Sequence, residues 1–235
     1  VVEEARQMDT GIVIHVDEGR GEEEDFQKRY GLSQVAMLEK VGLFTRPAVA
    51  AHCVHVSEAD LDILARHGVA VAHNPASNMK LSSGAAPVRR MLEKGIRVAI
   101  GTDGAASNND LDMFEEMRLA ALLQKLVTED STSLPAKQVV AMATSEGAAA
   151  LGLAGVTGRL EPGLRADLIL LDWRRAHFAP WHALYAGLVY AAHGLDVETT
   201  IVDGRILFEK GRVITLDEER ILFESERMAR RLLAS

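Results

Sequence analysis

The strongest constraint on the fold is the alternation of short apolar segments with helical patterns in the N-terminal part of the chain. Four segments are predicted to be strands: Gly11–Val16, Ala48–Val54, Val69–His73 and Arg97–Gly101. None alternates cleanly between apolar and polar residues, which indicates a parallel sheet with both faces covered. Repeated βα units of this length favour an α/β fold of the (β/α)₈ TIM-barrel type, and four strands would supply half of such a barrel.

Helix signals separate these strands. Residues Ser33–Val41 carry an apolar stripe, and Ser57 begins a helix with a capping-box pattern that includes Asp60 and ends at Gly68. A third helix is predicted over Ala86–Lys94. Helices between the strands agree with a parallel sheet that is covered on both faces.

The pattern changes in the last third of the chain. Helices predicted over Asp110–Val127 and Pro135–Leu151 are followed by Gly158–Asp172 and Thr199–Leu216, which are rich in branched residues and contain hairpin-type turn dipeptides. Residues Asp217–Leu233 form a charged amphipathic pattern. We expect three parts: residues 1-152, the C-terminal half of the barrel; residues 153-216, part of a small β-sandwich; and residues 217-235, a C-terminal helix.

Composition excludes several classes of protein. The chain has 235 residues and a formal net charge of −8, without the clustered Lys and Arg that nucleic-acid binding requires. Its apolar runs are too short to span a bilayer. The single cysteine, Cys53, allows no internal disulfide, and Val1–Gln7 does not resemble a signal peptide. We therefore expect a cytoplasmic protein that binds neither nucleic acid nor membrane.

Polar residues follow the four predicted strands. His15, His52, His73 and Asp103 lie at or just after the strand ends. Catalytic residues of βα barrels lie at the C-terminal ends of the strands. Imidazole and carboxylate are typical ligands of zinc and similar divalent ions, which lower the pKa of a coordinated water. The pattern therefore indicates a metal site.

A structural role is the more common one for any single histidine. His73 is the weakest of the four candidates and could only shape the loop Asn74–Leu81, whereas Glu18 follows His15 closely and Asp103 lies in a Gly-Thr-Asp-Gly turn. We expect the acidic run Glu22–Asp25 to be a solvated loop. Structural roles are also expected for the remaining histidines: His55, His67, His177, His182 and His193.

Five motifs in order resemble those of one family. They are His15–Glu18, Ala51–Cys53, His73–Leu81, Gly101–Met113 and Gly158–Leu168. The chain resembles the amidohydrolase superfamily, in particular the branch of methylthioadenosine/S-adenosylhomocysteine deaminases and triazine hydrolases. The resemblance covers nearly the whole chain, and the shared order makes it far more specific than any one motif.

The resemblance implies one divalent metal ion, zinc first, with iron and manganese as alternatives. It implies that His15 and Asp103 are metal ligands and that His52 lies beside the metal's water. Glu18 and Asp103 would contact the substrate, Glu18 as proton donor and Asp103 as proton acceptor. Asp17 departs from the family pattern, in which a small residue is usual, and a carboxylate there would perturb the pKa of Glu18.

The implied activity is hydrolytic deamination of a purine nucleoside or a related aromatic ring. Two alternatives use the same scaffold, a triazine chlorohydrolase or aminohydrolase and a cyclic-amide hydrolase; Glu18 after His15 favours the aromatic-ring deaminase over the latter. A third alternative is a non-catalytic subunit that binds a partner through an open barrel face.

The family's first two metal ligands, a His-x-His pair, do not occur in this sequence. We therefore expect the C-terminal half of the enzyme, beginning near barrel strand five and inactive alone. A homo-oligomer, or a second chain that completes the barrel, is the expected partner besides a small-molecule substrate.

Overall fold

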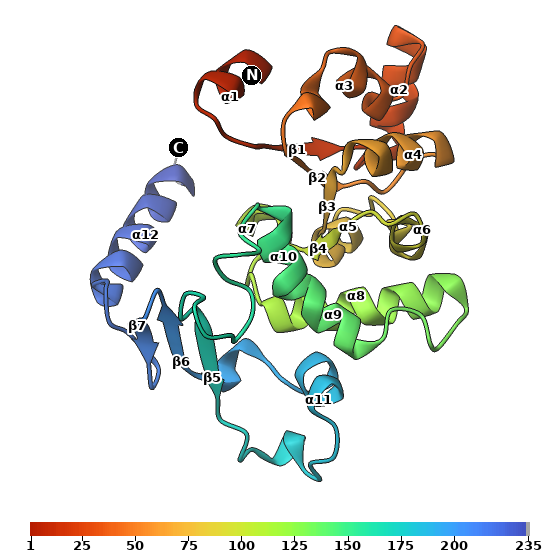
Figure 1. Ribbon diagram of the computed structural model, residues 1–235. Coiled ribbons are helices and arrows are strands. Elements are labelled where there is room, and N and C mark those ends of the chain that lie inside the picture. Colours follow the sequence, from red (N-terminus) through yellow and green to blue (C-terminus); the bar gives the residue numbers. More distant parts are fainter. Residues whose placement is uncertain (234–235) are drawn as a thin grey trace.

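A parallel sheet in chain order forms the centre of the computed structural model, which describes residues 1–233 (Figure 1). Its strands are β1 (Ile12–Val16), β2 (Ala48–His52), β3 (Ala70–His73) and β4 (Val98–Ile100). The register is continuous, because His15 pairs with Ala51, Ala51 with Ala72, and Ala72 with Ala99. The four predicted strands are confirmed.

One helix precedes β1, and further helices follow each strand. They are α1 (Val2–Gln7), α2 (Arg20–Tyr30), α3 (Gln34–Lys40), α4 (Glu58–His67), α5 (Pro75–Lys80), α6 (Val88–Glu93), α7 (Ala105–Asn108), α8 (Met113–Thr128), α9 (Ala136–Ala143) and α10 (Ser145–Ala150), with a 3-10 turn at Leu43–Thr45. The predicted capping box is present: Ser57 accepts from the backbone N–H of Asp60, and the Asp60 carboxylate accepts from that of Ser57.

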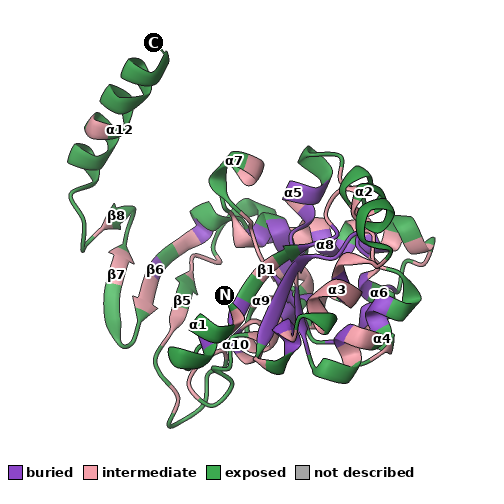
Figure 2. Ribbon diagram, turned by 90° about the horizontal axis from the view of Figure 1, so that it is seen from above, coloured by how far each residue is buried: buried purple, intermediate pink, exposed green. Residues whose placement is uncertain are grey.

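The main core lies between the sheet and these helices. Ala50, Val71 and Val98 occupy one register row and belong to the same buried cluster as the helix residues Leu61 and Leu64. Figure 2 shows the buried residues gathered in the parallel strands and the helices beside them. Burying a leucine side chain stabilises the fold by about 1.5–3 kcal/mol. The neighbouring row on the opposite face carries His15 and alanines, so the two faces of the sheet have different roles.

Strands β1 and β4 are the two outer strands of this sheet. Within residues 1–233 neither pairs with the other, and each has a hydrogen-bonded neighbour on one side alone. Val13, on the same face as His15, is 69% exposed. The interior of a closed barrel is filled with side chains. A four-stranded parallel sheet with two open edges is the arrangement expected for half of a barrel, and the predicted fold class is confirmed.

Three local predictions are wrong. The acidic run Glu22–Asp25 lies within α2, which sequence periodicity could not reveal because none of its residues is buried. The predicted loop Asn74–Leu81 contains α5, which begins at Pro75. The helix predicted over Pro135–Leu151 is divided into α9 and α10 at Thr144, whose φ of −127° and ψ of −91° interrupt the helix.

The second sheet is antiparallel and follows the barrel strands. Its order is β5 (Leu168–Leu171), β6 (Val197–Val202), β7 (Arg205–Glu209) and β8 (Arg212–Val213). Asp203-Gly204 and Lys210-Gly211 connect the last three strands as hairpin turns with positive φ at both positions, as their composition predicts.

Between β5 and β6 the chain leaves the sheet and returns to the barrel helices. It forms two 3-10 turns, Ala176–Phe178 and Gly194–Asp196, and the unpredicted helix α11 (Leu184–Tyr190), which packs on α8 and α9. The division of the chain after residues 152 and 216 stays a prediction.

The final helix, α12 (Glu218–Leu233), confirms the predicted amphipathic segment. None of its residues is buried. Figures 1 and 2 show it extending away from the barrel helices beside the second sheet. Among residues 1–233, no helix is both long enough and apolar enough to cross a bilayer.

Candidate metal centre

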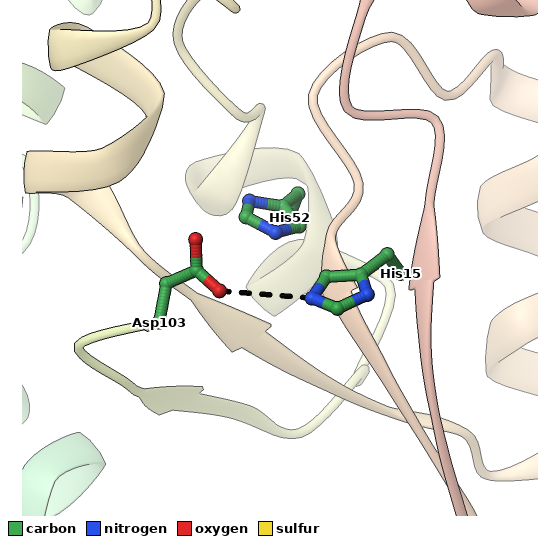
Figure 3. A group of neighbouring side chains, drawn as sticks. All are labelled: His15, His52 and Asp103. Atoms are coloured by element: carbon green, nitrogen blue, oxygen red, sulfur yellow. Dashed lines mark ion pairs between the residues drawn. The ribbon is translucent and has the colours of Figure 1, made fainter. Parts of the chain in front are cut away.

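Three of the predicted site residues converge at the C-terminal edge of the parallel sheet (Figure 3). His15, His52 and Asp103 each present one ligand atom, and these atoms lie within 4.8 Å of one another. His15 Nε2 lies 3.6 Å from Asp103 Oδ1, and the two imidazole rings stack at 5.2 Å. The predicted proximity of His15 and Asp103 is therefore present.

Left-handed backbone conformations bring two of these side chains to the site. His52 shares a register row with Val16, whose side chain faces the helix layer. With φ of 71°, however, the backbone of His52 leaves the extended conformation, and its ring meets that of His15. Asp103 has φ of 59° just after β4. Such conformations cost of order 1–3 kcal/mol in non-glycine residues and cluster at functional sites.

Two hydroxyl groups hold the Asp103 carboxylate. Ser77 Oγ and Ser107 Oγ both donate to Oδ2, at 2.8 and 2.5 Å, while Oδ1 faces His15. Partial burial acts to raise the pKa of Asp103, but the hydrogen bonds from Ser107, Ser77 and the Gly104 backbone outweigh it and lower the pKa to about 2. Asp103 is therefore ionised near neutral pH, as a metal ligand must be.

The imidazole of His52 is fully buried and has one fixed hydrogen-bond partner. Asn78 Oδ1 lies 2.8 Å from Nδ1, so the hydrogen belongs on Nδ1 and the lone pair on Nε2. Within residues 1–233, Nε2 is buried without a hydrogen-bond partner. Glu18 Oε2 lies 3.7 Å from this nitrogen. A buried lone pair of this kind is suited to a metal or its water.

Glu18 is held by the loop after α5. Ser83 Oγ donates to Glu18 Oε1 at 3.4 Å, and His55 Nε2 donates to the Ser83 carbonyl at 2.7 Å. His55 therefore has the structural role that its sequence context predicts, although it acts close to a candidate catalytic residue.

One short segment supports all three predicted catalytic residues. Ser77 binds Asp103, Asn78 binds His52, and Ser83 binds Glu18. We did not predict these supporting contacts. The signal was available in the motif His73–Leu81, whose Ser and Asn follow one another directly.

His73 does not join the group of potential ligands. It is fully buried, and within residues 1–233 neither ring nitrogen has a hydrogen-bond partner. Burial, and to a lesser degree the neighbouring His52, lowers the pKa of His73 to about 4. A buried, neutral imidazole outside the ligand group agrees with the prediction that His73 is the weakest of the four candidate site residues.

The side chain of Asp17, the residue that the resemblance predicts to be atypical, is buried. Burial first, and then the nearby carboxylates of Glu23 and Asp60, raise its pKa to about 8. The backbone N–H of Asp17 donates to Gln34 of α3. Asp17 is therefore protonated near neutral pH, which weakens the predicted like-charge effect on Glu18.

The donor set fits a divalent ion such as zinc. Imidazole and carboxylate are typical zinc ligands, and ligand atoms at ~2.0–2.2 Å from the ion lie roughly 3.3 Å from one another. The 3.6 Å between His15 Nε2 and Asp103 Oδ1 is close to this value. The buried, unpartnered Nε2 of His52 supplies an independent observation in favour of such an ion.

Comparisons with known proteins agree with this geometry. A model described as "Amidohydrolase family" matches residues 1–207. A 5-methylthioadenosine/S-adenosylhomocysteine deaminase of Desulforudis audaxviator is 56% identical over 235 residues, which are 100% of this chain and 55% of that protein.

Two similar solved structures contain zinc. An adenosine deaminase of Xanthomonas campestris with bound zinc matches with a TM-score of 0.95 at 35% identity, over 99% of this chain and 53% of that one. An atrazine chlorohydrolase of Arthrobacter aurescens complexed with zinc has a TM-score of 0.86 at 30% identity, over 96% and 50%. This chain thus spans about half the length of each relative. The predicted resemblance is confirmed, and the chain belongs to the amidohydrolase family.

Proposed function

We propose that this chain is the C-terminal part of a metal-dependent hydrolase that removes an amino group from a purine nucleoside or a related aromatic ring. The observation that carries the proposal is the convergence of His15, His52 and Asp103 with Glu18 beside them. The deaminase name of the relative that is 56% identical supports the substrate class.

In this proposal His15 and Asp103 hold one divalent ion, zinc first, with iron and manganese as alternatives. A bound ion of this kind acidifies the water it coordinates and so supplies a nucleophile near neutral pH. The zinc in two solved relatives supports this choice of metal.

The chain's own residues then orient the reactants and move protons. Nε2 of His52 has a free lone pair and accepts a hydrogen bond from the attacking water. Asp103 takes the proton of that water. Glu18 gives its proton to the ring nitrogen beside the carbon under attack. Asp103 passes the proton that it took to the amino group, which leaves as ammonia, and the proton of the remaining hydroxyl returns to Glu18 as the carbonyl forms. General acid–base help of this kind contributes typically ~10²–10⁴-fold.

The site is open on the side of β1. The His15 side chain is 69% exposed, as is Val13 on the same face. We propose that a further part of the barrel covers this face, either as part of a longer chain or as a second polypeptide, and that the enzyme is a homo-oligomer. The absence of basic clusters and the single buried cysteine support a cytoplasmic enzyme with no nucleic-acid or membrane partner.

The test is metal content and ammonia release in a complete barrel protein that contains this chain. We expect about one equivalent of zinc, loss of deamination of methylthioadenosine, S-adenosylhomocysteine or adenosine on chelation, and recovery when zinc returns. Protein purified from zinc-supplemented medium without a bound divalent ion would refute the enzyme and favour the binding subunit.

A second candidate, hydrolysis of a triazine, rests on the similarity to the atrazine chlorohydrolase. The same four residues would serve it, with chloride or an alkylamine as the leaving group. Side-by-side assays with adenosine-type substrates and with atrazine distinguish the two. A cyclic-amide hydrolase has no comparable support beyond the shared family.

A further inference from the structure

We propose that Glu116, a buried carboxylate on α8, is a positioning residue that fixes the Asp103 side chain for its ligand. The inference rests on the proposed metal site and goes beyond it, because Glu116 touches none of the candidate ligands. It acts through two backbone segments that carry the partners of Asp103.

Glu116 connects two elements that are separate in sequence. The residue is 1% exposed. Its Oε2 accepts from the backbone N–H of Ala76 in α5 at 3.2 Å, and its Oε1 accepts from the side-chain Nδ2 of Asn108 in α7. Both oxygens are therefore engaged, each by a different element of the site.

Each hydrogen-bond donor to Glu116 lies next in sequence to a serine that binds Asp103. Ala76 precedes Ser77, whose hydroxyl donates to Asp103 Oδ2, and Asn108 follows Ser107, whose hydroxyl donates to the same oxygen. Glu116 thus ties together the two segments that hold one carboxylate oxygen from both sides.

A third connection reaches the backbone beside Asp103. Asn108 Nδ2 also donates to the carbonyl of Thr102 at 2.9 Å. Thr102 directly precedes Asp103, whose φ of 59° lies in the left-handed region. A non-glycine residue persists in this conformation only where the surroundings hold it. The Glu116–Asn108 pair supplies such a constraint.

Burial makes a purely structural role for this carboxylate costly. No ion pair of Glu116 is found within residues 1–233, and its α8 neighbours Met117 and Ala120 show that this side of the helix accepts apolar residues. Burying a carboxylate without a cation costs free energy that an apolar side chain would not cost. The hydrogen bonds of Glu116, rather than its packing, therefore explain a carboxylate at this position.

The test uses Glu116→Gln in the complete barrel protein loaded with Co²⁺, whose visible absorption spectrum reports the coordination geometry. The amide has an NH₂ group in place of one carboxylate oxygen. Glutamine can therefore accept only one of the two hydrogen bonds, from the Ala76 N–H or from Asn108 Nδ2. We expect an altered cobalt spectrum, metal affinity weakened about 10-fold, and a fall in kcat with little change in KM.

Two control variants on the same helix separate positioning from stability. Glu115→Gln makes the same chemical change at an exposed neighbour and should leave spectrum, affinity and kcat as in the wild type. Gln124→Ala removes a buried polar group that donates to the Ala86 carbonyl, away from Asp103. It should lower Tm without altering the cobalt spectrum.

The outcomes divide cleanly. A Glu116→Gln protein that loses stability like Gln124→Ala, but keeps the wild-type spectrum and metal affinity, overturns the positioning role and leaves the proposed function intact. A wild-type protein that binds no Co²⁺ or Zn²⁺ overturns the proposed function and the positioning role together. Should Glu116→Gln not fold, Asn108→Ala breaks the same link from its half-buried end; an unchanged spectrum there overturns the proposal.

Discussion

The Asn78 Oδ1 atom lies 2.8 Å from Nδ1 of His52 and so determines which imidazole nitrogen carries the hydrogen. Both side chains are completely buried. Because a carboxamide oxygen only accepts hydrogen bonds, Nε2 is left with its lone pair facing the candidate metal centre. The orientation of His52 thus depends on a residue that belongs to α5.

Replacing Asn78 with Leu tests this dependence. The substitution keeps a similar volume but removes the acceptor, so the His52 ring can take the other tautomer. We expect kcat to fall about 10–100-fold while KM changes little, the range typical of a partner of an active-site imidazole. Steady-state kinetics measure kcat and KM, and a thermal unfolding curve checks that the variant is folded. Turnover within about twofold of the wild type would contradict the tautomer argument.

A second prediction concerns Glu18. Glu18→Gln in the complete protein should keep the metal and lower kcat by roughly 10²–10⁴-fold, because the amide still occupies the site but cannot deliver the proton. Metal analysis and ammonia release are the measurements. Glu22→Gln, at an exposed position of α2, is the charge-matched control. Loss of the ion from the Glu18 variant would make this residue a ligand instead.

The barrel strands were predictable because burial restricts their composition. The run Ala48–His52 is buried at every position, and its first four residues are all apolar, so it stands out from its surroundings. Helix α2 is the opposite case: none of its residues is buried, and a helix without an apolar stripe cannot be distinguished from an acidic loop.

For the site, sequence could predict which residues meet but not how they are held. His15 and Asp103 follow strands of one parallel sheet, and such strand ends share an edge. The left-handed backbone of His52 has no glycine to mark it. The hydrogen bonds from Ser77 and Asn78 depend on α5, a helix of six residues, too short to show a periodicity.

A third prediction follows from the pKa of Glu116. Burial first raises this pKa, and the hydrogen bonds from Ala76 and Asn108 only partly oppose it, leaving a value of about 7 against 4.5 for a free side chain. The folded state therefore holds the proton more firmly than the unfolded state. The associated stability is fully present below the unfolded value near 4.5 and is lost as pH rises through about 7.

Glu116→Gln removes this titration, so its pH profile should be flatter than that of the wild type. The wild type should lose up to roughly 3 kcal/mol of unfolding free energy between about pH 4.5 and pH 8 that the variant does not lose. The difference in unfolding free energy, variant minus wild type, should rise by that amount over the range. Urea unfolding at both ends of the range measures the difference. Parallel profiles of the two proteins would show that Glu116 does not titrate in this window.

The open face of β1 leads to the last prediction. Val13 lies two residues before His15 on the face that a closed barrel would fill, and within residues 1–233 the outer edge of β1 has no partner strand. Exposed edges and apolar faces promote association. The 235-residue chain alone should therefore self-associate, bind metal weakly and lack activity, as light scattering, metal titration and an ammonia assay would register.

Val13→Lys makes this prediction specific to the inner face. A charge there should reduce self-association of the isolated chain, because like charges oppose edge and face pairing. The same charge should block recovery of activity when the chain is mixed with a polypeptide that supplies the other half of the barrel, because a filled interior has no room for an ammonium group. Val41→Lys, at a position that is 58% exposed at the end of α3, is the control and should permit recovery. Equal recovery with both variants would mean that the face around Val13 stays open to solvent in the active protein.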